Sequence, residues 1–210
     1  MTAGQQRAFD ENWERWGLDA DAGRLDLQQA FQREAPVTLE IGFGMGHSLV
    51  QMAKSDPARD FIGIEVHKPG VGRLLHSMAD EQVHNIRVYC HDAVEVLREC
   101  IDDSALDRVQ VFFPDPWHKK RHNKRRLIQP AFVDQLADKI AGGGELHLAT
   151  DWEHYAEQMM EVLTASPRYS NRSGARQYAL RPESRPLTKF EQRGERLGHG
   201  VWDLIFVKEC

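Results

Sequence analysis

Short apolar runs alternate with amphipathic stretches through the middle of the chain. Five runs have the length and apolar content of buried strands, and they span residues 37–41, 61–65, 86–90, 109–113 and 145–149. Apolar residues recur at helical spacing after these runs, which predicts helices near residues 48–54, 71–78, 93–101, 130–140 and 155–163. This alternation predicts an α/β fold, in which a parallel sheet carries helices on both faces and a ligand site at the carboxyl ends of its strands.

The two ends of the chain have weaker patterns. Residues 1–36 are polar and predict two short helices, at 5–16 and 25–34. The tail from Tyr169 is irregular until a last predicted strand at 202–207.

Glycines mark several expected breaks. Gly17 and Gly23 are predicted to be breaks between the first two helices, and the glycine run 142–144 is predicted to end the helix that begins at Pro130. No repeat or linker divides the 210 residues, so we expect a single domain. Its parts are an N-terminal helical segment, a core and a C-terminal part, at 1–36, 37–165 and 166–210.

Composition is that of an ordinary soluble protein, with 41% hydrophobic and 28% charged residues. No apolar run approaches the ~20 residues that cross a bilayer, and the first residues do not have the pattern of a signal peptide. The cysteines, Cys90, Cys100 and Cys210, have neither metal-binding spacing nor a disulfide pattern. We therefore expect a cytoplasmic protein without a membrane partner.

Positive charge is concentrated in one place. The net charge is −5, yet residues 118–126 contain six Lys and Arg and no acid, so that subtracting six leaves −11 for the rest of the chain. We call residues 118–126 the basic segment. A basic segment on an acidic body favours local binding of a polyanion. A solvated charged surface is the alternative.

An acidic residue directly precedes the basic segment. The apolar run 109–113 stops at Pro114, and Asp115 then lies between two prolines that restrict its backbone. Trp117 follows, as a ring that could stack on a base or pack in the core. A rigidly held acid, an aromatic ring and a phosphate-binding segment at one strand end indicate a site that works on a nucleobase.

A glycine-rich turn follows the first predicted strand. Gly42, Gly44 and Gly46 come directly before a helix, with Glu40 two residues ahead of the first glycine. A dinucleotide-binding turn would have its third glycine at position 47, where this chain has His47. The pattern instead resembles the first motif of class I S-adenosylmethionine-dependent methyltransferases. A tight strand–helix turn without a ligand is the alternative.

Two further acids end the next strands. Glu65 ends the second, where a carboxylate can accept hydrogen bonds from both ribose hydroxyls, and Asp92 follows the third, near where such methyltransferases hold the adenine amino group. Glu65 could instead be a solvated strand end, and Asp92 the N-cap of the helix at 93. Acids and glycines on successive strand ends favour S-adenosylmethionine as the cofactor.

The same motifs identify a family. The sequences at 40–46, 63–67, 112–126, 148–152 and 188–191 resemble the bacterial tRNA (guanine-N7-)-methyltransferases, and the resemblance extends over nearly the whole chain from about Gln5. It implies a Rossmann-like class I methyltransferase fold, with a mostly parallel seven-stranded sheet and helices on both faces. It also implies a cofactor-binding core and a C-terminal part that contacts substrate.

The resemblance further implies roles for individual residues. Asp115 would be catalytic and would also contact the cofactor. The other cofactor contacts would be Glu40, Gly42, Gly44, Gly46, Glu65 and Asp92. Substrate contacts would fall on Lys119, Asp151, Thr188, Lys189, Phe190 and Glu191. Contacts to tRNA would fall on Arg121, His122, Asn123, Lys124, Arg125 and Arg126.

Some of these residues have simpler explanations. Asp151 could cap the helix expected from Trp152, and Thr188 with Glu191 matches a capping box. His118 and His122 have the spacing of a helical metal pair, but the surrounding cations would repel a metal ion, so we predict no metal site. We expect a monomer, with a homodimer as the alternative.

The implied reaction needs little from the protein. Guanine N7 carries an unprotonated lone pair, so alignment and a carboxylate that stabilises charge on the ring could suffice. An amino-methyltransferase acting on adenine or cytosine is one alternative, although such enzymes carry a second proline after the acid and its neighbour, where this chain has Trp117. A non-catalytic RNA-binding module is the other, and the intact glycine turn argues against it.

Overall fold

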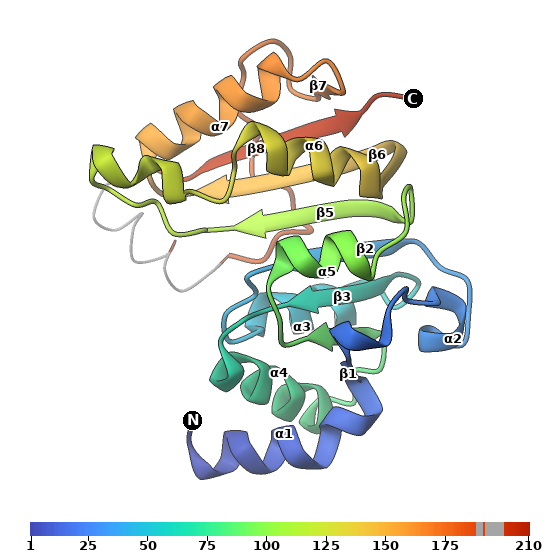
Figure 1. Cartoon of the computed structure of the whole chain (residues 1–210). Coiled ribbons are helices and arrows are strands. Elements are labelled where there is room, and N and C mark those ends of the chain that lie inside the picture. The colour runs from blue at the N-terminus through green and yellow to red at the C-terminus, as the bar shows by residue number, and fades with distance from the viewer. Residues whose placement is uncertain (188–190, 192–199) are drawn as a thin grey trace.

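The structure is a computed structural model that describes residues 1–187, 191 and 200–210. One sheet with helices on both faces organises these residues (Figure 1). Its strands, in sheet order, are β1 (Gly17–Leu18), β4 (Ile86–Tyr89), β3 (Asp60–Ile64), β2 (Val37–Ile41), β5 (Leu106–Phe112), β6 (Ile140–Thr150), β8 (Trp202–Lys208) and β7 (Tyr169–Asn171). The helices are α1 (Ala3–Trp16), α2 (Leu27–Phe31), α3 (His47–Ser55), α4 (Lys68–Asp80), α5 (Ala93–Glu99), α6 (Pro130–Lys139) and α7 (Glu153–Ala165), with 3₁₀ turns η1 (Ala20–Ala22) and η2 (Lys120–Arg125).

Strand pairing confirms the predicted α/β class. The strands from β1 to β6 pair in parallel, and only β8 and β7 run antiparallel at one edge, within the described residues. The described sheet has eight strands instead of seven, because the chain after α1 pairs Gly17 with Val88 and Leu18 with Tyr89. A side chain at position 17 would overlap the ring of Trp13, with its Cβ 2.3 Å away, so this close turn into the sheet requires glycine.

Three segments differ from the sequence expectation. The second helix, α2, ends early because Gln32 adopts a left-handed conformation with φ of 56°. The glycine run 142–144 does not end α6, which stops at Lys139. It lies inside β6, where the register against β5 shifts. The tail contains a short strand, β7, at the point where we expected irregular structure. The last two depend on pairing with distant strands, which local patterns do not report.

Apolar clusters cover the two faces of the sheet. Leu39 packs with residues of α5, α6 and α7 on one face, whereas Phe61 packs with residues of α1, α3 and α4 on the other. The crossovers place the carboxyl ends of the parallel strands, β2 to β5 among them, along one edge. The loops that carry the predicted acids therefore meet there.

One buried acid lies within the sheet itself. Glu40 on β2 and Gln110 on β5 are register partners, and Gln110 Nε2 donates to Glu40 Oε2 at 2.8 Å. Glu40 is only 3% exposed. Burial raises the pKa of Glu40 to about 7, although the hydrogen bond from Gln110 acts in the opposite direction. A group that ionises near neutrality is thus built into the sheet beneath the glycine turn.

This burial predicts a pH-dependent stability. An unfolded Glu40 loses its proton near pH 4.5 and the folded one near 7, so the contribution of Glu40 to the free energy of unfolding should fall as pH rises between these values. Glu40→Gln removes this dependence. The free energy of unfolding of Glu40→Gln minus that of the wild type should therefore rise by about 3 kcal/mol between pH 4.5 and pH 7 and stay constant above pH 7.

Urea unfolding at pH 5 and pH 8 would measure the effect. Glu157→Gln, at an exposed position of α7, is the matched control and should change stability equally at both pH values. A constant difference between Glu40→Gln and the wild type would show that Glu40 ionises alike in both states.

Candidate active site

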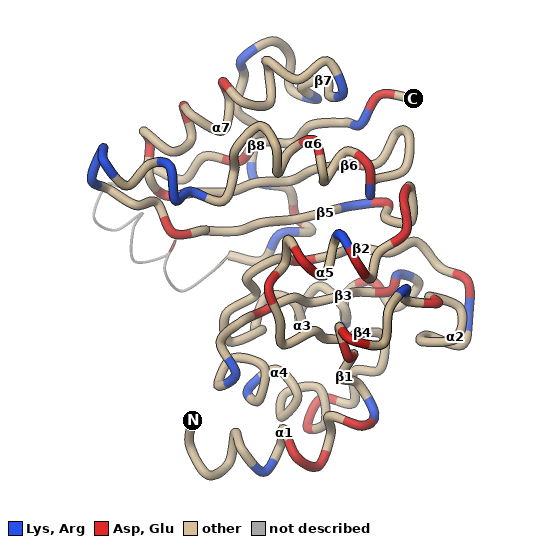
Figure 2. The backbone as a smooth tube through the Cα atoms, in the orientation of Figure 1, with Lys and Arg blue, Asp and Glu red and all other residues tan. Residues whose placement is uncertain are grey.

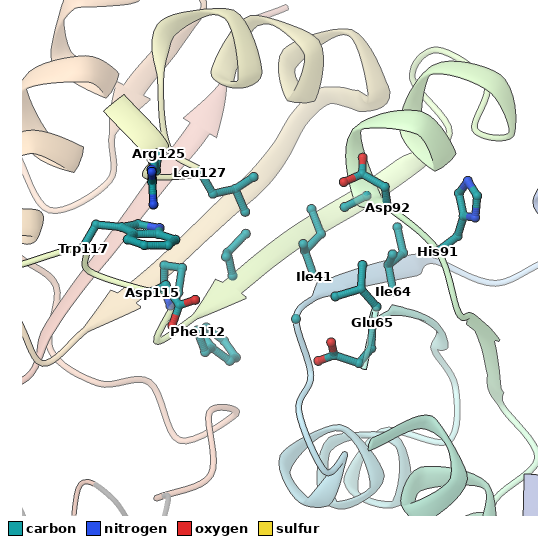
Figure 3. A pocket seen from close by; sticks show the side chains of 15 residues that line it. Ile41, Ile64, Glu65, His91, Asp92, Phe112, Asp115, Trp117, Arg125 and Leu127 are labelled. Carbon is teal, nitrogen blue, oxygen red and sulfur yellow. The ribbon is translucent and has the colours of Figure 1, made fainter. Parts of the chain in front are cut away.

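A cavity of about 310 Å³ opens at the carboxyl ends of β2, β3, β4 and β5. Its apolar wall includes Ile41 and Ile64, and its carboxylates are Glu65, Asp92 and Asp115 (Figure 3). The structure thus brings together three acids that are far apart in sequence, as the parallel topology predicts. The volume is within the range of small-molecule sites.

The glycine turn forms one side of this cavity. Gly42, Gly44 and Gly46 all have positive φ, at 74°, 59° and 76°, which side-chain-bearing residues rarely adopt. Gly42 lines the cavity, and a Cβ built there would meet no atom within 4 Å, so open space lies beside the backbone. At Gly70, in the first turn of α4, a Cβ would lie 2.1 Å from the carbonyl oxygen of Gly44. Close packing against α4 therefore holds the turn.

Glu65 is held by backbone donors. Its Oε2 accepts a hydrogen bond from Gly44 N and its Oε1 one from His67 N, both at 2.9 Å. Since the side chain is half-buried and bonded, it is not a solvated strand end. Each carboxylate oxygen has a second lone pair, so the side chain can still accept hydrogen bonds from a ligand in the cavity.

Asp92 is both a helix cap and a cavity residue. Its Oδ1 accepts from Val94 N at 2.9 Å and Glu95 N at 3.2 Å, which confirms it as the N-cap of α5. Capping uses one oxygen, and the exposed side chain also lines the cavity. Glu40 and Gly46 are buried, and with Gly44 they are not among the cavity-lining residues, so their cofactor contacts stay predictions.

Asp115 belongs to two cavities. It lines the one described above and an adjoining one of about 430 Å³, whose other residues are Pro116, Trp117, His118, Lys119 and His122. The turn that carries Asp115 is strained, because Phe113 and Trp117 have φ of 53° and 45°. Phe113 N donates to Ala149 O at 2.8 Å, which fixes the start of the turn on β6.

The basic segment forms the outer side of these cavities. It contains η2 and exposes five of its cations: Lys119, Lys120, Arg121, Lys124 and Arg125. Figure 2 shows Lys and Arg positions gathered on the chain between β5 and α6. Arg125 lies over the ring of Trp117, 5.1 Å from its centroid, and both line the first cavity (Figure 3). Trp117 is half-buried, so its ring is at a cavity wall and not deep in the core.

Arg126 corrects the predicted set of tRNA contacts. It is 2% exposed, and its guanidinium donates to Pro116 O at 2.7 Å and to Gln158 Oε1 at 2.5 Å. The ring of Tyr155 lies beneath it at 4.7 Å. With Nε and Nη1 bonded inside the protein, the buried Arg126 is not an exposed cation like its neighbours, and it links the basic segment to α7.

The predicted substrate contacts fall into three groups. Lys119 is exposed and lines the second cavity with Asp115, and Asp151 is exposed directly after β6. The N-cap of α7 is Trp152, which makes no side-chain cap bond, so Asp151 is not the cap of this helix. Glu191 is 3% exposed and its Oε1 lies 2.6 Å from Arg185 Nη2, so it is a buried ion-pair partner here, and its contact with substrate stays a prediction. Thr188, Lys189 and Phe190, with the predicted capping box, lie outside the described residues.

The two histidines of the basic segment contact different rings. His118 meets Trp152 edge-on at 4.3 Å, whereas His122 meets Trp117 edge-on at 6.0 Å. Across the described part of the chain, no group of three His, Cys, Asp or Glu side chains could hold a metal ion. Nor does any helix described here have the length and apolar character to cross a membrane.

Sequence patterns missed several residues near this site. Leu127 closes one wall of the first cavity, and His91 lines it beside Asp92. Arg185 contacts the rings of Phe112 and Phe113 from the C-terminal tail. Arg185 gave no signal because it stands in an irregular, proline-containing stretch, where neither spacing nor periodicity predicts burial.

Known proteins are similar to this chain in sequence and in fold. A family model described as "Putative methyltransferase" matches residues 34–204. The tRNA (guanine-N(7)-)-methyltransferase of Pseudoalteromonas atlantica is 60% identical over 99% of this chain and 87% of its own length. That of Idiomarina loihiensis is 61% identical over 98% and 84%. Among solved structures, the aminoglycoside resistance methyltransferase NpmB1 is similar in fold, with a TM-score of 0.59 and 16% identity over 92% of this chain and 95% of that one. The chain belongs to the tRNA (guanine-N(7)-)-methyltransferase family.

Proposed function

We propose that this chain transfers the methyl group of S-adenosylmethionine to N7 of a guanine in tRNA, and that Asp115 is its catalytic residue. The observation that carries the proposal is the position of Asp115 in the wall of two adjoining cavities. One has the strand-end acids and glycine turn suited to the cofactor, and the other adjoins the basic segment. A group that bridges donor and acceptor sites is where the transfer must occur.

The first cavity fits the cofactor by its chemistry. Gly42 leaves room beside the backbone, Glu65 would accept hydrogen bonds from the ribose hydroxyls, and Asp92 would accept one from the adenine amino group. Gly44 and Gly46 shape the turn, and Glu40 supports it from the sheet. The bound cofactor supplies an electrophilic methyl group on a sulfonium sulfur.

The second cavity would receive the guanine. Trp117 would stack on the base, and Lys119 and Asp151 would contact the target nucleotide. Arg121, His122, Asn123, Lys124 and Arg125 would contact tRNA around it. The core 37–165 would thus hold the cofactor, and the part from 166 to 210 would complete the substrate side.

Asp115 would act by charge and by orientation. Its carboxylate can accept hydrogen bonds from the N–H edge of guanine, which aligns N7 with the donor. Positive charge reaches the guanine ring as the new bond forms, and the carboxylate stabilises it. The proline on each side and the strained turn limit where this carboxylate can move.

We place this reaction in the cytoplasm, where tRNA is modified, and propose a monomeric enzyme. Sedimentation would distinguish the monomer from a homodimer.

The atom attacked gives the first test of this function. In a tRNA transcript with 7-deazaguanine at the target position, carbon replaces the nucleophilic nitrogen. This transcript should bind like the normal one and accept no labelled methyl group. Label on the 7-deazaguanine would point to an amino group as target, and lack of label on the unmodified transcript would favour a non-catalytic RNA-binding module.

Asp115→Asn tests the carboxylate. The substitution keeps the shape and removes the charge, so the single-turnover rate constant at saturating tRNA and cofactor should fall roughly 10²–10³-fold. Folding and most tRNA affinity should persist, because the phosphate contacts lie in the basic segment. A rate constant close to wild type would mean that alignment alone carries the reaction.

Salt dependence tests the basic segment. Replacing Arg121 and Lys124 with glutamine should weaken tRNA binding and reduce the slope of log affinity against log salt by roughly 1–2. The control replaces Lys54 and Arg98, exposed cations on α3 and α5, and has the same change in charge. Equal slopes for the two double variants would mean that the basic segment is a solvated charged surface and does not bind tRNA.

A further inference from the structure

A buried ionic cluster lies next to the strand end that carries Asp115. Arg185, Glu191, His147 and Asp203 are each only 2–3% exposed. Arg185 donates through Nε and Nη2 to the two oxygens of Asp203, both at 2.8 Å, and Nη2 also lies 2.6 Å from Glu191 Oε1. Nε2 of His147 lies 2.7 Å from Asp203 Oδ1. The cluster therefore joins the tail to strands β6 and β8.

The protonation of this cluster follows from its contacts. Burial raises the pKa of Asp203, but hydrogen bonds from His147 and Arg185 outweigh it and hold the pKa below its ordinary value. Burial also lowers the pKa of His147, so its ring is neutral at pH 7 and carries its proton on Nε2 toward the carboxylate. Asp203 thus stays ionised and binds Arg185 through a charge-assisted bidentate pair.

Arg185 also contacts the base of the Asp115 turn. Its guanidinium carbon lies 5.7 Å from the ring centroid of Phe112 and 5.7 Å from that of Phe113. The ring of His147 meets Phe112 edge-on at 4.9 Å. Phe113 is the strained residue with which the turn begins. The cluster therefore packs on the two residues that set the direction of the chain toward Asp115.

The other partner of Arg185 belongs to the predicted substrate segment. Glu191 ends the run 188–191, for which the family resemblance implies substrate contact. One guanidinium thus binds the end of that run and packs on the Phe112–Phe113 pair. Its own Nη1 is buried and has no hydrogen-bond partner among the described residues.

Stability alone does not account for such a cluster. Buried ion pairs contribute little net stability, because desolvation of the charges offsets their attraction, and an apolar group of similar size often packs as well. A planar guanidinium with several donors can instead fix the relative position of the segments that it joins.

We propose that Arg185 is a positioning residue for methyl transfer: by binding Glu191 and Asp203 and packing on Phe112 and Phe113, it fixes the turn that presents Asp115 to the target guanine. The inference rests on the proposed function and adds to it a residue outside both cavities. It concerns the reaction step and the tRNA side, since Arg185 does not line the cofactor cavity.

Arg185→Lys is the main test, because it keeps the charge and removes the planar fork. The single-turnover rate constant at saturating tRNA and cofactor should fall roughly 10–10²-fold, as for a small misplacement of a reacting group. S-adenosylmethionine affinity should stay within about twofold of wild type. Arg108→Lys is the matched control: it alters the ion pair with Glu145 at the opposite end of β5 and should leave the rate constant unchanged.

A double-mutant cycle with Asp115→Asn separates positioning from general destabilisation. If Arg185 acts through Asp115, Arg185→Lys should change the rate constant less than about twofold in the Asp115→Asn background. The proposal would be overturned if Arg185→Lys lowered the rate constant by the same factor in the wild-type and Asp115→Asn backgrounds. It would also be overturned if Arg185→Lys and Arg108→Lys had the same effect on the rate constant.

Glu191→Gln keeps the test decisive if Arg185→Lys does not fold. It removes the charge from one partner and should also lower the rate constant while leaving cofactor affinity unchanged. A wild-type rate constant in this variant would overturn the inference. Failure of the proposed function would be distinct, since the wild-type protein would then leave no N7-methylguanine in tRNA.

Discussion

Phe113 follows β5 in the left-handed backbone conformation, and the position of Asp115 depends on how that turn is held. The turn begins with the hydrogen bond from Phe113 N to Ala149 O and ends at Trp117, which is also left-handed. Backbone of this kind costs free energy and persists only where its surroundings determine it. Prolines at 114 and 116 help, because they leave the intervening residue few alternative conformations.

The acids at the carboxyl edge differ in how much they are already satisfied. Glu40 is buried with one amide donor, Glu65 is half-buried with two backbone donors, and Asp92 uses one oxygen to cap a helix. Asp115 is exposed between its two cavities. The order matches the role expected of each carboxylate. A carboxylate that supports the turn, such as Glu40, needs hydrogen-bond donors within the protein, whereas one that contacts substrate, such as Asp115, needs free lone pairs.

Local patterns predicted what local physics decides. The bounds of β2, the glycine turn with positive φ and the cap at Asp92 all follow from adjacent residues, so the α/β class and the cofactor edge could be predicted. The burial of Arg126 and of Glu191 could not. The sequence of a basic run does not tell whether a guanidinium faces water or, like that of Arg126, donates a hydrogen bond to Gln158, 32 residues further along the chain. The pairing of β1 with β4 likewise joins segments about 70 residues apart.

Two buried arginines contact the two ends of the Asp115 turn. Arg126 binds Pro116 O and stacks on Tyr155, which ties the far end of the turn to α7. Arg185 packs on Phe112 and Phe113 and ties the near end to β8 through Asp203. A lysine could supply the charge at either place but not the planar surface or the several directed donors. Arg126 belongs to the basic segment and Arg185 to the C-terminal tail. Contact of tRNA with either segment would therefore affect the position of the Asp115 carboxylate.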